Sequence, residues 1–264
     1  MIITSPQNQK IKDVVKLRDR RSRDSSDLFL IEGYREILRA VEGGVQLDSL
    51  FFCPQLFLGS NEKSLIERIE ASHYQCVENV FRKISYRDRP DGLLAVAKQK
   101  HLQLEELVLK ENPFLVIAEA IEKPGNLGTI LRSCDAVGID ALIVSDRCTD
   151  IYNPNVVRAS VGTLFTVPVV EAEGKEILPW LKAKGISIVA ATPHAKINYT
   201  DAPLAGGIAI AVGTEQYGLS PLWMEQADIQ VSLPMRGAAD SLNVATATTV
   251  LLYEALRQRK LFKG

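Results

Sequence analysis

Apolar and polar positions alternate differently before and after residue 113 of the chain. From that point, short apolar runs typical of buried strands alternate with segments whose apolar residues recur at helical spacing. The predicted strands are 114–118, 141–144, 164–170, 186–191, 208–212 and 229–233, and the predicted helices are 127–137, 155–160, 177–183 and 242–260. Strands that alternate with helices in this way predict an α/β domain with a largely parallel sheet and helices on both faces.

The first part of the chain predicts a second, smaller α/β unit. Its patterns predict strands at 28–31, 50–52 and 93–97 and helices at 11–17, 34–41 and 61–71. The charged stretch 98–112 is predicted to be a helical linker, and Pro113 marks the start of the next unit. We therefore expect a domain over residues 1–105, a linker over 106–112 and a second domain over 113–264.

The composition is that of an ordinary globular protein, with 264 residues, 46% of them apolar and 24% charged. No apolar run approaches the length of a membrane span, and the first residues lack the apolar core of a signal peptide. We therefore expect a cytoplasmic protein with no membrane partner. The four cysteines form no Cys-x-x-Cys pair and the three histidines have no nearby partner, so no metal site is expected.

Positive charge gathers near the N-terminus, although the net charge of the whole chain is only −1. Asp13 and Asp19 are the only acidic residues among a run of basic ones, namely Lys10, Lys12, Lys16, Arg18, Arg20, Arg21 and Arg23. Such a patch attracts a phosphate backbone even when the whole protein is close to neutral. The alternative is a helix face whose charges are merely solvated, and the sequence leaves both interpretations open.

The first of three candidate functional loops covers residues 122–128. Pro124 and Gly125 predict a turn that delivers Asn126 to the N-cap of the following helix. Arg132 lies off the centre of the apolar stripe of that helix, near enough to its start to project beside the loop. Taken alone, this pattern fits a capped helix with a surface arginine somewhat better than it fits a site.

The other two loops also lie at strand ends. Gly213 and Gly218 follow an apolar strand, where glycines permit close approach of a ligand at the carboxyl edge of a sheet. Ser241 and Asn243 open the last helix, where they are either caps or polar groups of a site. The glycines match neither the dinucleotide-binding fingerprint nor the phosphate loop of nucleotide-binding enzymes, which argues against a metabolic enzyme of those classes.

In this order and spacing, the three loops resemble the three signature motifs of the SpoU-type (TrmH-like) RNA ribose 2′-O-methyltransferases of the SPOUT superfamily. The resemblance covers residues 113–259 and includes the segment 153–162. Residues 29–33 and 91–96 resemble the accessory substrate-binding domain of that family, which is related to a large-subunit ribosomal protein. The family implies a C-terminal trefoil-knotted domain that forms a homodimer and binds S-adenosyl-L-methionine. It also implies a structured RNA substrate, ribosomal or transfer RNA, and the accessory domain slightly favours ribosomal RNA.

The resemblance also implies roles for particular residues. The catalytic group would comprise Asn126, Arg132, Glu215, Ser241 and Asn243. The cofactor would be held by Thr192, Gly213, Gly218, Leu233, Leu242 and Asn243. RNA would be contacted by Lys10, Lys12, Lys16, Arg20 and Arg158. The alternative is a non-catalytic, ribosome-associated RNA-binding protein with the same fold.

Arg132 matches an arginine of the first motif in the family. In relatives, the matching arginine is proposed to deprotonate the ribose hydroxyl with help from an RNA phosphate. A guanidinium, with a pKa above about 12, is a very poor base. We therefore expect Arg132 to hold the adjacent phosphate and stabilise the developing alkoxide, while the proton passes to phosphate or water and Asn126 holds Arg132 or the ribose.

Overall fold

The computed structural model describes residues 1–259, which divide by their internal contacts into two compact units. The first unit contains Met1–Lys100 and Asp150–Thr166, and the second contains His101–Thr149 and the chain from Val167 onward. The segment Asp150–Thr166 packs with the first unit, although we expected it within the second. The buried ion pair between Arg23 and Asp150, 2.6 Å long, is one physical reason.

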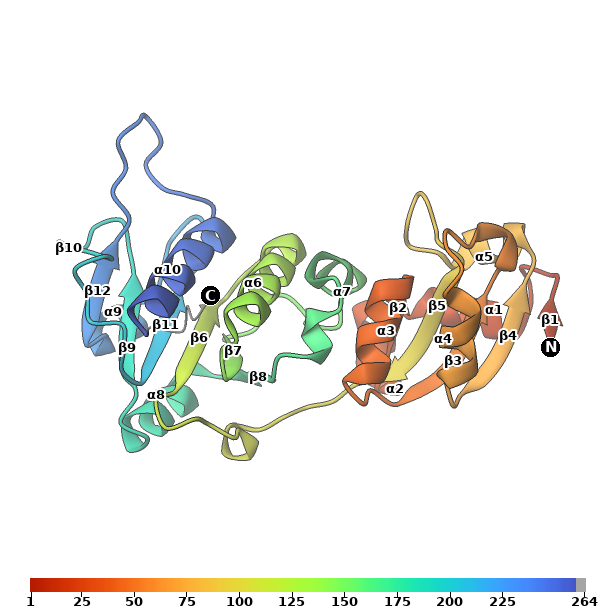
Figure 1. Cartoon of the computed structure of the whole chain (residues 1–264), viewed down its shortest axis with the longest axis horizontal. Helices are drawn as coiled ribbons and strands as arrows, with labels where there is room; N and C mark the ends of the chain where they lie inside the picture. Colours follow the sequence, from red (N-terminus) through yellow and green to blue (C-terminus); the bar gives the residue numbers. More distant parts are fainter. Residues whose placement is uncertain (260–264) are drawn as a thin grey trace. The chain divides into compact units, whose positions relative to one another are not determined.

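The first unit is built on a five-stranded mixed sheet in the order β1-β4-β3-β5-β2 (Figure 1). Its strands are β1 (Ile2–Ile3), β2 (Leu28–Glu32), β3 (Leu47–Phe52), β4 (Ser72–Cys76) and β5 (Leu93–Lys98). Its helices are α1 (Gln9–Lys16), α2 (Arg20–Ser26), α3 (Tyr34–Glu42), α4 (Glu62–Arg68), α5 (Glu78–Ile84) and α7 (Pro154–Ser160). Strand β5 pairs antiparallel with β2 and β3, and β4 pairs parallel with β1 and β3. An apolar core lies between one sheet face and helices α1 and α5.

The predicted elements of this unit are all present, but β1, β4, α2 and α5 were not predicted. Strand β4 is largely half-buried, and its polar sequence lacks the apolar signal of a strand. Helix α2 has no apolar stripe: its Asp19 cap and its buried residue Arg23 hold it in place. Arg23 donates hydrogen bonds to the carbonyl oxygens of Leu17 and Arg18 as well as to Asp150.

The second unit is built on a seven-stranded sheet in the order β10-β12-β9-β11-β6-β7-β8. Its strands are β6 (Phe114–Glu119), β7 (Ala141–Ser145), β8 (Val169–Ala172), β9 (Ser187–Ala191), β10 (Ile197–Asn198), β11 (Ile208–Val212) and β12 (Ile229–Ser232). Its helices are α6 (Pro124–Val137), α8 (Gly174–Ala183), α9 (Pro221–Gln226) and α10 (Val244–Gln258). Every strand pair is parallel, which confirms the predicted α/β sheet.

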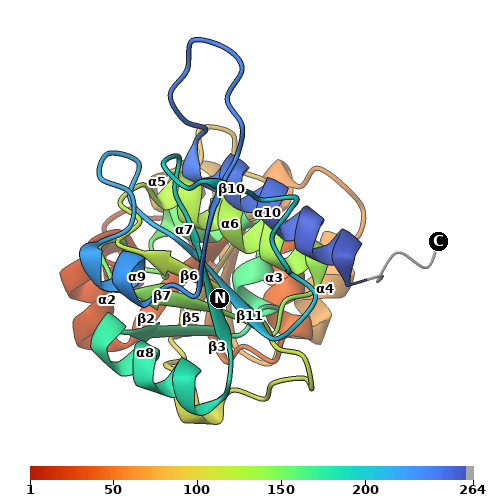
Figure 2. The same ribbon diagram turned by 90° about the vertical axis from the view of Figure 1, so that its left-hand side faces the viewer.

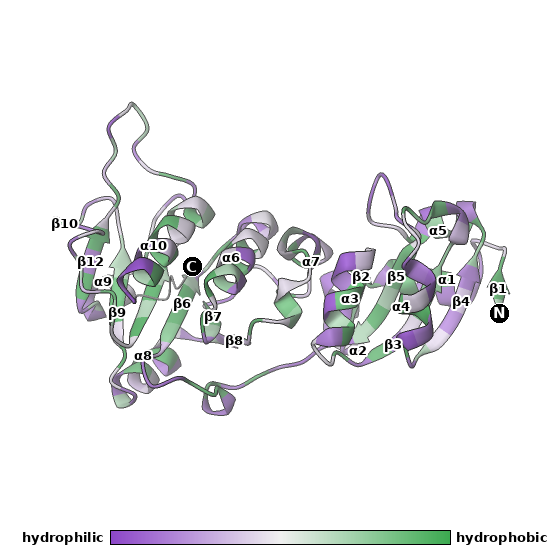
Figure 3. Ribbon diagram, in the orientation of Figure 1, coloured by the Kyte–Doolittle hydropathy of each residue, from purple (hydrophilic) through white to green (hydrophobic). Residues whose placement is uncertain are grey.

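Helices cover both faces of this parallel sheet, with α6 and α10 on one face and α8 and α9 on the other (Figure 2). The central strands are apolar on both faces, as buried parallel strands must be (Figure 3). Trp223 of α9 and Leu181 of α8 are fully buried against one face. On the other face, the hydroxyls of Ser133 and Thr249 join α6 to α10 at 2.6 Å.

Two local predictions were wrong. The stretch 98–112 contains no α-helix; it has one turn of 3-10 helix at Leu104–Glu106. Its leucines instead pack against the core of the second unit, with Leu104 buried and Leu102 bridged to Val170 of β8. The stretch 164–170 is not one strand, because a 3-10 turn at Thr163–Phe165 precedes β8. The domain boundaries and the trefoil knot stay predictions.

Within residues 1–259, no helix is both long enough and apolar enough to cross a membrane.

Candidate functional site

Strand order brings the three candidate loops to one edge of the second sheet. Strand β11 lies between β9 and β6, so the loop after β11 borders the loop that leads from β6 into α6. The loop after β12, residues 233–243, extends beyond the same carboxyl edge before it enters α10 (Figure 1). Ligands of parallel α/β sheets bind at this edge, where the strand order changes direction.

The carboxylate of Glu215 joins all three loops. Its Oε1 accepts hydrogen bonds from Asn126 Nδ2 of the first loop and, at 3.0 Å, from Asn243 Nδ2 of the third. Its Oε2 accepts a hydrogen bond and ion pair from Lys123 of the first loop. Asn243 Nδ2 also lies 3.1 Å from Asn126 Oδ1, so the two amides contact each other as well as the carboxylate.

The ionisation of Glu215 follows from these contacts. The hydrogen bond from Lys123 is the main cause that lowers the pKa of the Glu215 carboxyl; desolvation opposes it, and the hydrogen bond from Asn126 adds to the lowering. The carboxylate is therefore charged at neutral pH. Because the Lys123 side chain is 67% exposed, this ion pair contributes little stability and mainly fixes the position of the carboxylate.

The second loop is a tight turn closed by its own backbone. Thr214 and Gly218 exchange two backbone hydrogen bonds of 3.0 Å each, and Gly218 adopts a positive φ of 69°. A side chain at Gly213 would overlap with the carbonyl oxygen of Gly218, so the turn requires glycine there. The turn presents Glu215 toward the other two loops.

The two asparagines are positioned differently from each other. Asn243 is the N-cap of α10: its Oδ1 accepts from the backbone N–H of Ala245 at 3.0 Å, while its Nδ2 donates to the other loops. It is therefore both a cap and a site residue. The prediction that Asn126 is an N-cap was wrong, because α6 begins at Pro124 and its cap position is Lys123. Proline suits a first helical position, so the helix starts earlier and the Asn126 amide is left to bind Glu215.

A cavity of about 450 Å³ opens beside this junction. Seven of the predicted site residues line it, namely Thr192, Gly213, Glu215, Gly218, Leu233, Ser241 and Leu242. Its other walls include residues that the sequence did not single out: His194, Tyr217, Met224, Met235 and Leu251. Position at the carboxyl ends of β9, β11 and β12 is the signal that could have found His194 and Met235. Lys123 was also missed, because the sequence alone does not place it opposite Glu215.

Arg132 lies on α6, outside the lining of the cavity. Its side chain is exposed, and no hydrogen bond or ion pair within residues 1–259 involves it. It stands about 9 Å farther along the helix axis than Asn126, at ~1.5 Å per residue. Side chains lean toward the start of a helix, and the positions in front of Arg132 are Gly125 and Gly128. The guanidinium is exposed and is available to bind an anion.

The predicted RNA-binding residues all lie in the first unit and are exposed: Lys10, Lys12, Lys16, Arg20 and Arg158. Lys10 lies over the ring of Tyr74, and Lys16 pairs with Asp13 at 2.9 Å. Arg23, which belongs to the same basic run, is only 1% exposed and is not part of any charged surface.

No disulfide joins the cysteines, and among the described residues no cluster of three or more His, Cys, Asp or Glu side chains could hold a metal ion. Burial raises the pKa of the Cys134 thiol, which is fully enclosed in α6 and behaves as a small apolar residue.

Family models match both parts of the chain. The SpoU rRNA Methylase family matches residues 113–253, and the MRM3-like substrate binding domain matches residues 8–95. A 23S rRNA uridine 2′-O-methyltransferase of Streptomyces viridochromogenes is 32% identical over 250 residues, covering 92% of this chain and 87% of the relative. The 23S rRNA guanosine 2′-O-methyltransferase RlmP of Bacillus subtilis is 30% identical, covering 95% and 97%.

Solved structures agree with these matches. A crystal structure described as an RNA 2′-O ribose methyltransferase is 42% identical, with a TM-score of 0.88, and covers 98% of this chain and 100% of its own. The SpoU methyltransferase AviRb of Streptomyces viridochromogenes, in complex with the cofactor AdoMet, is 30% identical with a TM-score of 0.89, covering 96% and 99%.

Proposed function

Since the chain belongs to the SpoU rRNA methylase family, we propose that its second unit transfers the methyl group of S-adenosylmethionine to a ribose 2′-hydroxyl of ribosomal RNA. The enzyme is an RNA ribose 2′-O-methyltransferase that works in the cytoplasm as a homodimer. The first unit holds the RNA. The observation that carries the proposal is the junction at Glu215, where the three motif loops meet beside a cavity of about 450 Å³.

The cavity fits S-adenosylmethionine in size and character. Its volume lies within the range of roughly 300–1,000 Å³ typical of small-molecule sites. Leu219, Val231 and Leu251 give it apolar walls for an adenosine, while Thr192 and Ser241 offer hydroxyls at its lining. The ionised Glu215 adds a negative charge that suits a cationic sulfonium. Gly213, Leu233 and Leu242 line the cavity, and we assign backbone contacts with the cofactor to them. Gly218 and Asn243 complete the set we assign to the cofactor.

Bound S-adenosylmethionine supplies an activated methyl group, and the side chains must hold the ribose oxygen in line with it. Arg132 binds the phosphate next to the target ribose and stabilises the negative charge that develops on the 2′-oxygen. A guanidinium is a very poor base, so the hydroxyl proton passes to phosphate or water. Asn126, Ser241 and Asn243 orient the ribose, and Glu215 holds the two asparagines in place.

Arg132 does not line the cavity of its own chain, so the arginine that acts at this cavity can come from the other copy of the chain. We assign it to the site of the second copy in the homodimer. Mixed dimers test this assignment, with Arg132→Ala in one copy and Gly213→Ala in the other. Activity of the mixture above that of either variant alone supports transfer between copies, and no recovery places Arg132 in the site of its own chain.

The activity itself is tested with tritiated-methyl S-adenosylmethionine and protein-free ribosomal RNA. A methyl group on the 2′-oxygen protects the next phosphodiester bond from alkali, because the attacking hydroxyl is gone. We expect the label in an alkali-resistant dinucleotide. Label released as a mononucleotide would indicate base methylation, and no incorporation into any ribosomal RNA would favour the non-catalytic RNA-binding alternative.

A further inference from the structure

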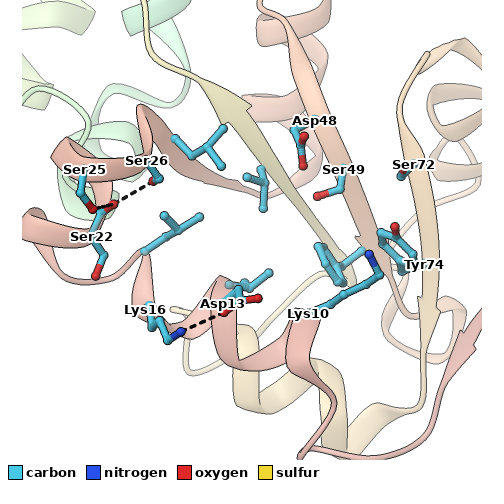
Figure 4. Close-up of a pocket in the computed structure, with 15 residues that line it drawn as sticks. Lys10, Asp13, Lys16, Ser22, Ser25, Ser26, Asp48, Ser49, Ser72 and Tyr74 are labelled. Carbon is cyan, nitrogen blue, oxygen red and sulfur yellow. Dashed lines mark hydrogen bonds and ion pairs between the residues drawn. The ribbon is translucent and has the colours of Figure 1, made fainter.

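The first unit contains a cavity of its own, of about 510 Å³, that the methyl-transfer chemistry does not use. It lies between helices α1 and α2 and the sheet face formed by β3, β4 and β5 (Figure 4). Helix α2 is short and polar, so it covers the sheet without filling the space above it. The floor is apolar and includes Phe51 and Val96, both of which are buried.

An aromatic ring forms one wall of this cavity. Tyr74 of β4 packs one side of its ring near Phe51, with the ring centroids 5.1 Å apart. The ammonium group of Lys10 lies over the ring, 4.6 Å from its centroid. A flexible lysine stem is easily displaced, so Lys10 marks a ring face that a flat ligand can occupy.

The rest of the rim combines cations with hydrogen-bonding groups. Lys16 from α1, which pairs with Asp13 at 2.9 Å, and the serines of α2 line the cavity, and Asp48 stands at the far side. The hydroxyl of Ser49 faces the cavity (Figure 4) and makes no hydrogen bond within the described part of the chain. An apolar floor, one aromatic wall, hydroxyls and two lysines together suit a nucleotide: the base stacks, its edge is hydrogen-bonded and its phosphates pair with the lysines.

We propose that this cavity receives one unpaired nucleotide of the RNA substrate, whose base stacks on Tyr74 while Lys10 moves from the ring to the neighbouring phosphate. The inference rests on the proposed function, because that function makes RNA the ligand. It goes beyond that function, which says only that the first unit holds the RNA. Here a site for one base is assigned to the sheet face of that unit.

The test uses the full chain and a fluorescein-labelled single-stranded RNA of about ten nucleotides. Stacking on an aromatic ring is worth a large factor per base, so Tyr74→Leu should weaken binding about tenfold, while Tyr74→Phe should keep most of it. Lys10→Gln should weaken binding about threefold and lower the salt slope by about one. Lys63→Gln, an exposed lysine of α4 away from the cavity, is the matched control and should have no effect.

Two further measurements guard against a misfolded variant. Ser25→Trp places a bulky side chain on the exposed rim and should block binding without touching the core. Cross-linking of a 4-thiouridine RNA should label the peptide that contains Tyr74 in the wild type and lose that label in Ser25→Trp. Equal RNA affinity for Tyr74→Leu, Ser25→Trp and Lys63→Gln, or cross-links only outside the cavity, would overturn the inference.

Methyl incorporation into ribosomal RNA is measured in the same preparations. If the wild type methylates RNA and Tyr74→Leu binds RNA as tightly as the wild type does, the nucleotide site is rejected and the proposed function stands. A wild type that methylates no RNA rejects the proposed function, while the binding and cross-linking results still decide whether the cavity takes a nucleotide.

Discussion

The two units carry cavities of similar volume, about 510 Å³ in the first and 450 Å³ in the second, but they build them in different places. The second unit places its cavity at the carboxyl edge of an all-parallel sheet, where three loops converge on Glu215. The first unit places its cavity on the face of a mixed sheet, under two short helices that carry lysines and serines.

This difference separates two tasks within one chain. A sheet edge gathers backbone groups and small polar side chains from distant segments, which suits a cofactor that must be held in one geometry. A partly covered sheet face offers an aromatic wall and mobile cations, which suit a flexible RNA strand. Variants of one cavity should therefore change methyl transfer or cofactor binding, and variants of the other should change RNA affinity.

The largest effect is expected for Arg132→Ala. Loss of a group that stabilises developing charge costs roughly 10²- to 10³-fold in turnover. Cofactor affinity should stay within about twofold of wild type, because Arg132 does not line the cavity. Single-turnover methylation and calorimetry separate the two effects, and Arg68→Ala on the exposed face of α4 serves as the control. Full activity in Arg132→Ala would remove it from the mechanism.

Gly213→Ala should act on the cofactor instead. The added methyl group overlaps with the carbonyl oxygen of Gly218, so the turn that carries Glu215 must open. We expect S-adenosylmethionine affinity to fall at least about tenfold, as a loss of roughly 1.4 kcal/mol or more. Gly206→Ala is the matched control, because open space surrounds that position. Unchanged affinity in Gly213→Ala would show that the turn does not shape the site.

The effects of Glu215→Gln and Lys123→Gln on the cofactor KM show which contact at the junction matters more. Glu215→Gln removes the charge that both asparagines and Lys123 share, so we expect a cofactor KM raised about tenfold. Lys123→Gln breaks an exposed pair only and should raise the KM about threefold. Lys175→Gln, which breaks an exposed pair with Glu173, controls for loss of a surface charge. The proposed junction is wrong if Lys123→Gln costs more than Glu215→Gln.

The same carboxylate predicts a pH dependence. Its pKa is lowered from 4.5 in the folded chain, so its contribution is complete above pH 4.5 and is lost as the pH falls through the lowered value. Cofactor affinity of the wild type should therefore fall on acidification below pH 4.5, measured by fluorescence titration. Glu215→Gln should lack this part of the profile. Parallel profiles for the two proteins would contradict the assignment.

The smallest effect is expected for single charges of the first unit. Lys12→Gln removes an exposed cation of α1 and should lower RNA affinity about two- to threefold, with a salt slope smaller by about one. Methyl transfer at saturating RNA should not change. RNA affinity is measured over a series of salt concentrations for Lys12→Gln, the wild type and Lys63→Gln. An unaltered salt slope in Lys12→Gln would show that this face of α1 is solvated and does not contact RNA.

The second unit was the more predictable of the two. Strands β6, β7 and β11 are buried along their whole length and appear as continuous apolar runs, so their positions and the parallel sheet followed from the pattern. The less buried β10 and the short helix α9 were not predicted. The three loops were found by their order. The contact of Lys123 and Asn126 with Glu215 could not be predicted, because it depends on β11 pairing with β6 across about ninety residues of sequence.

The first unit was less predictable because polar residues form some of its strands and helices. Strand β4 contains Ser72, His73 and Gln75, and helix α2 lacks an apolar stripe. The signal of α5 was present in Val80, Phe81 and Ile84 at helical spacing. Arg23 belongs to a basic run in sequence, yet it is buried against Asp150, and no local pattern indicates so distant a partner.

The most direct test is a crystal structure of the full chain with S-adenosylhomocysteine. We expect the sulfur to lie in the cavity bounded by Gly213, Leu233 and Leu242, with the three loops still joined at Glu215. A ligand bound elsewhere, with that cavity closed or empty, would contradict the claim that these loops form the methyl-transfer site.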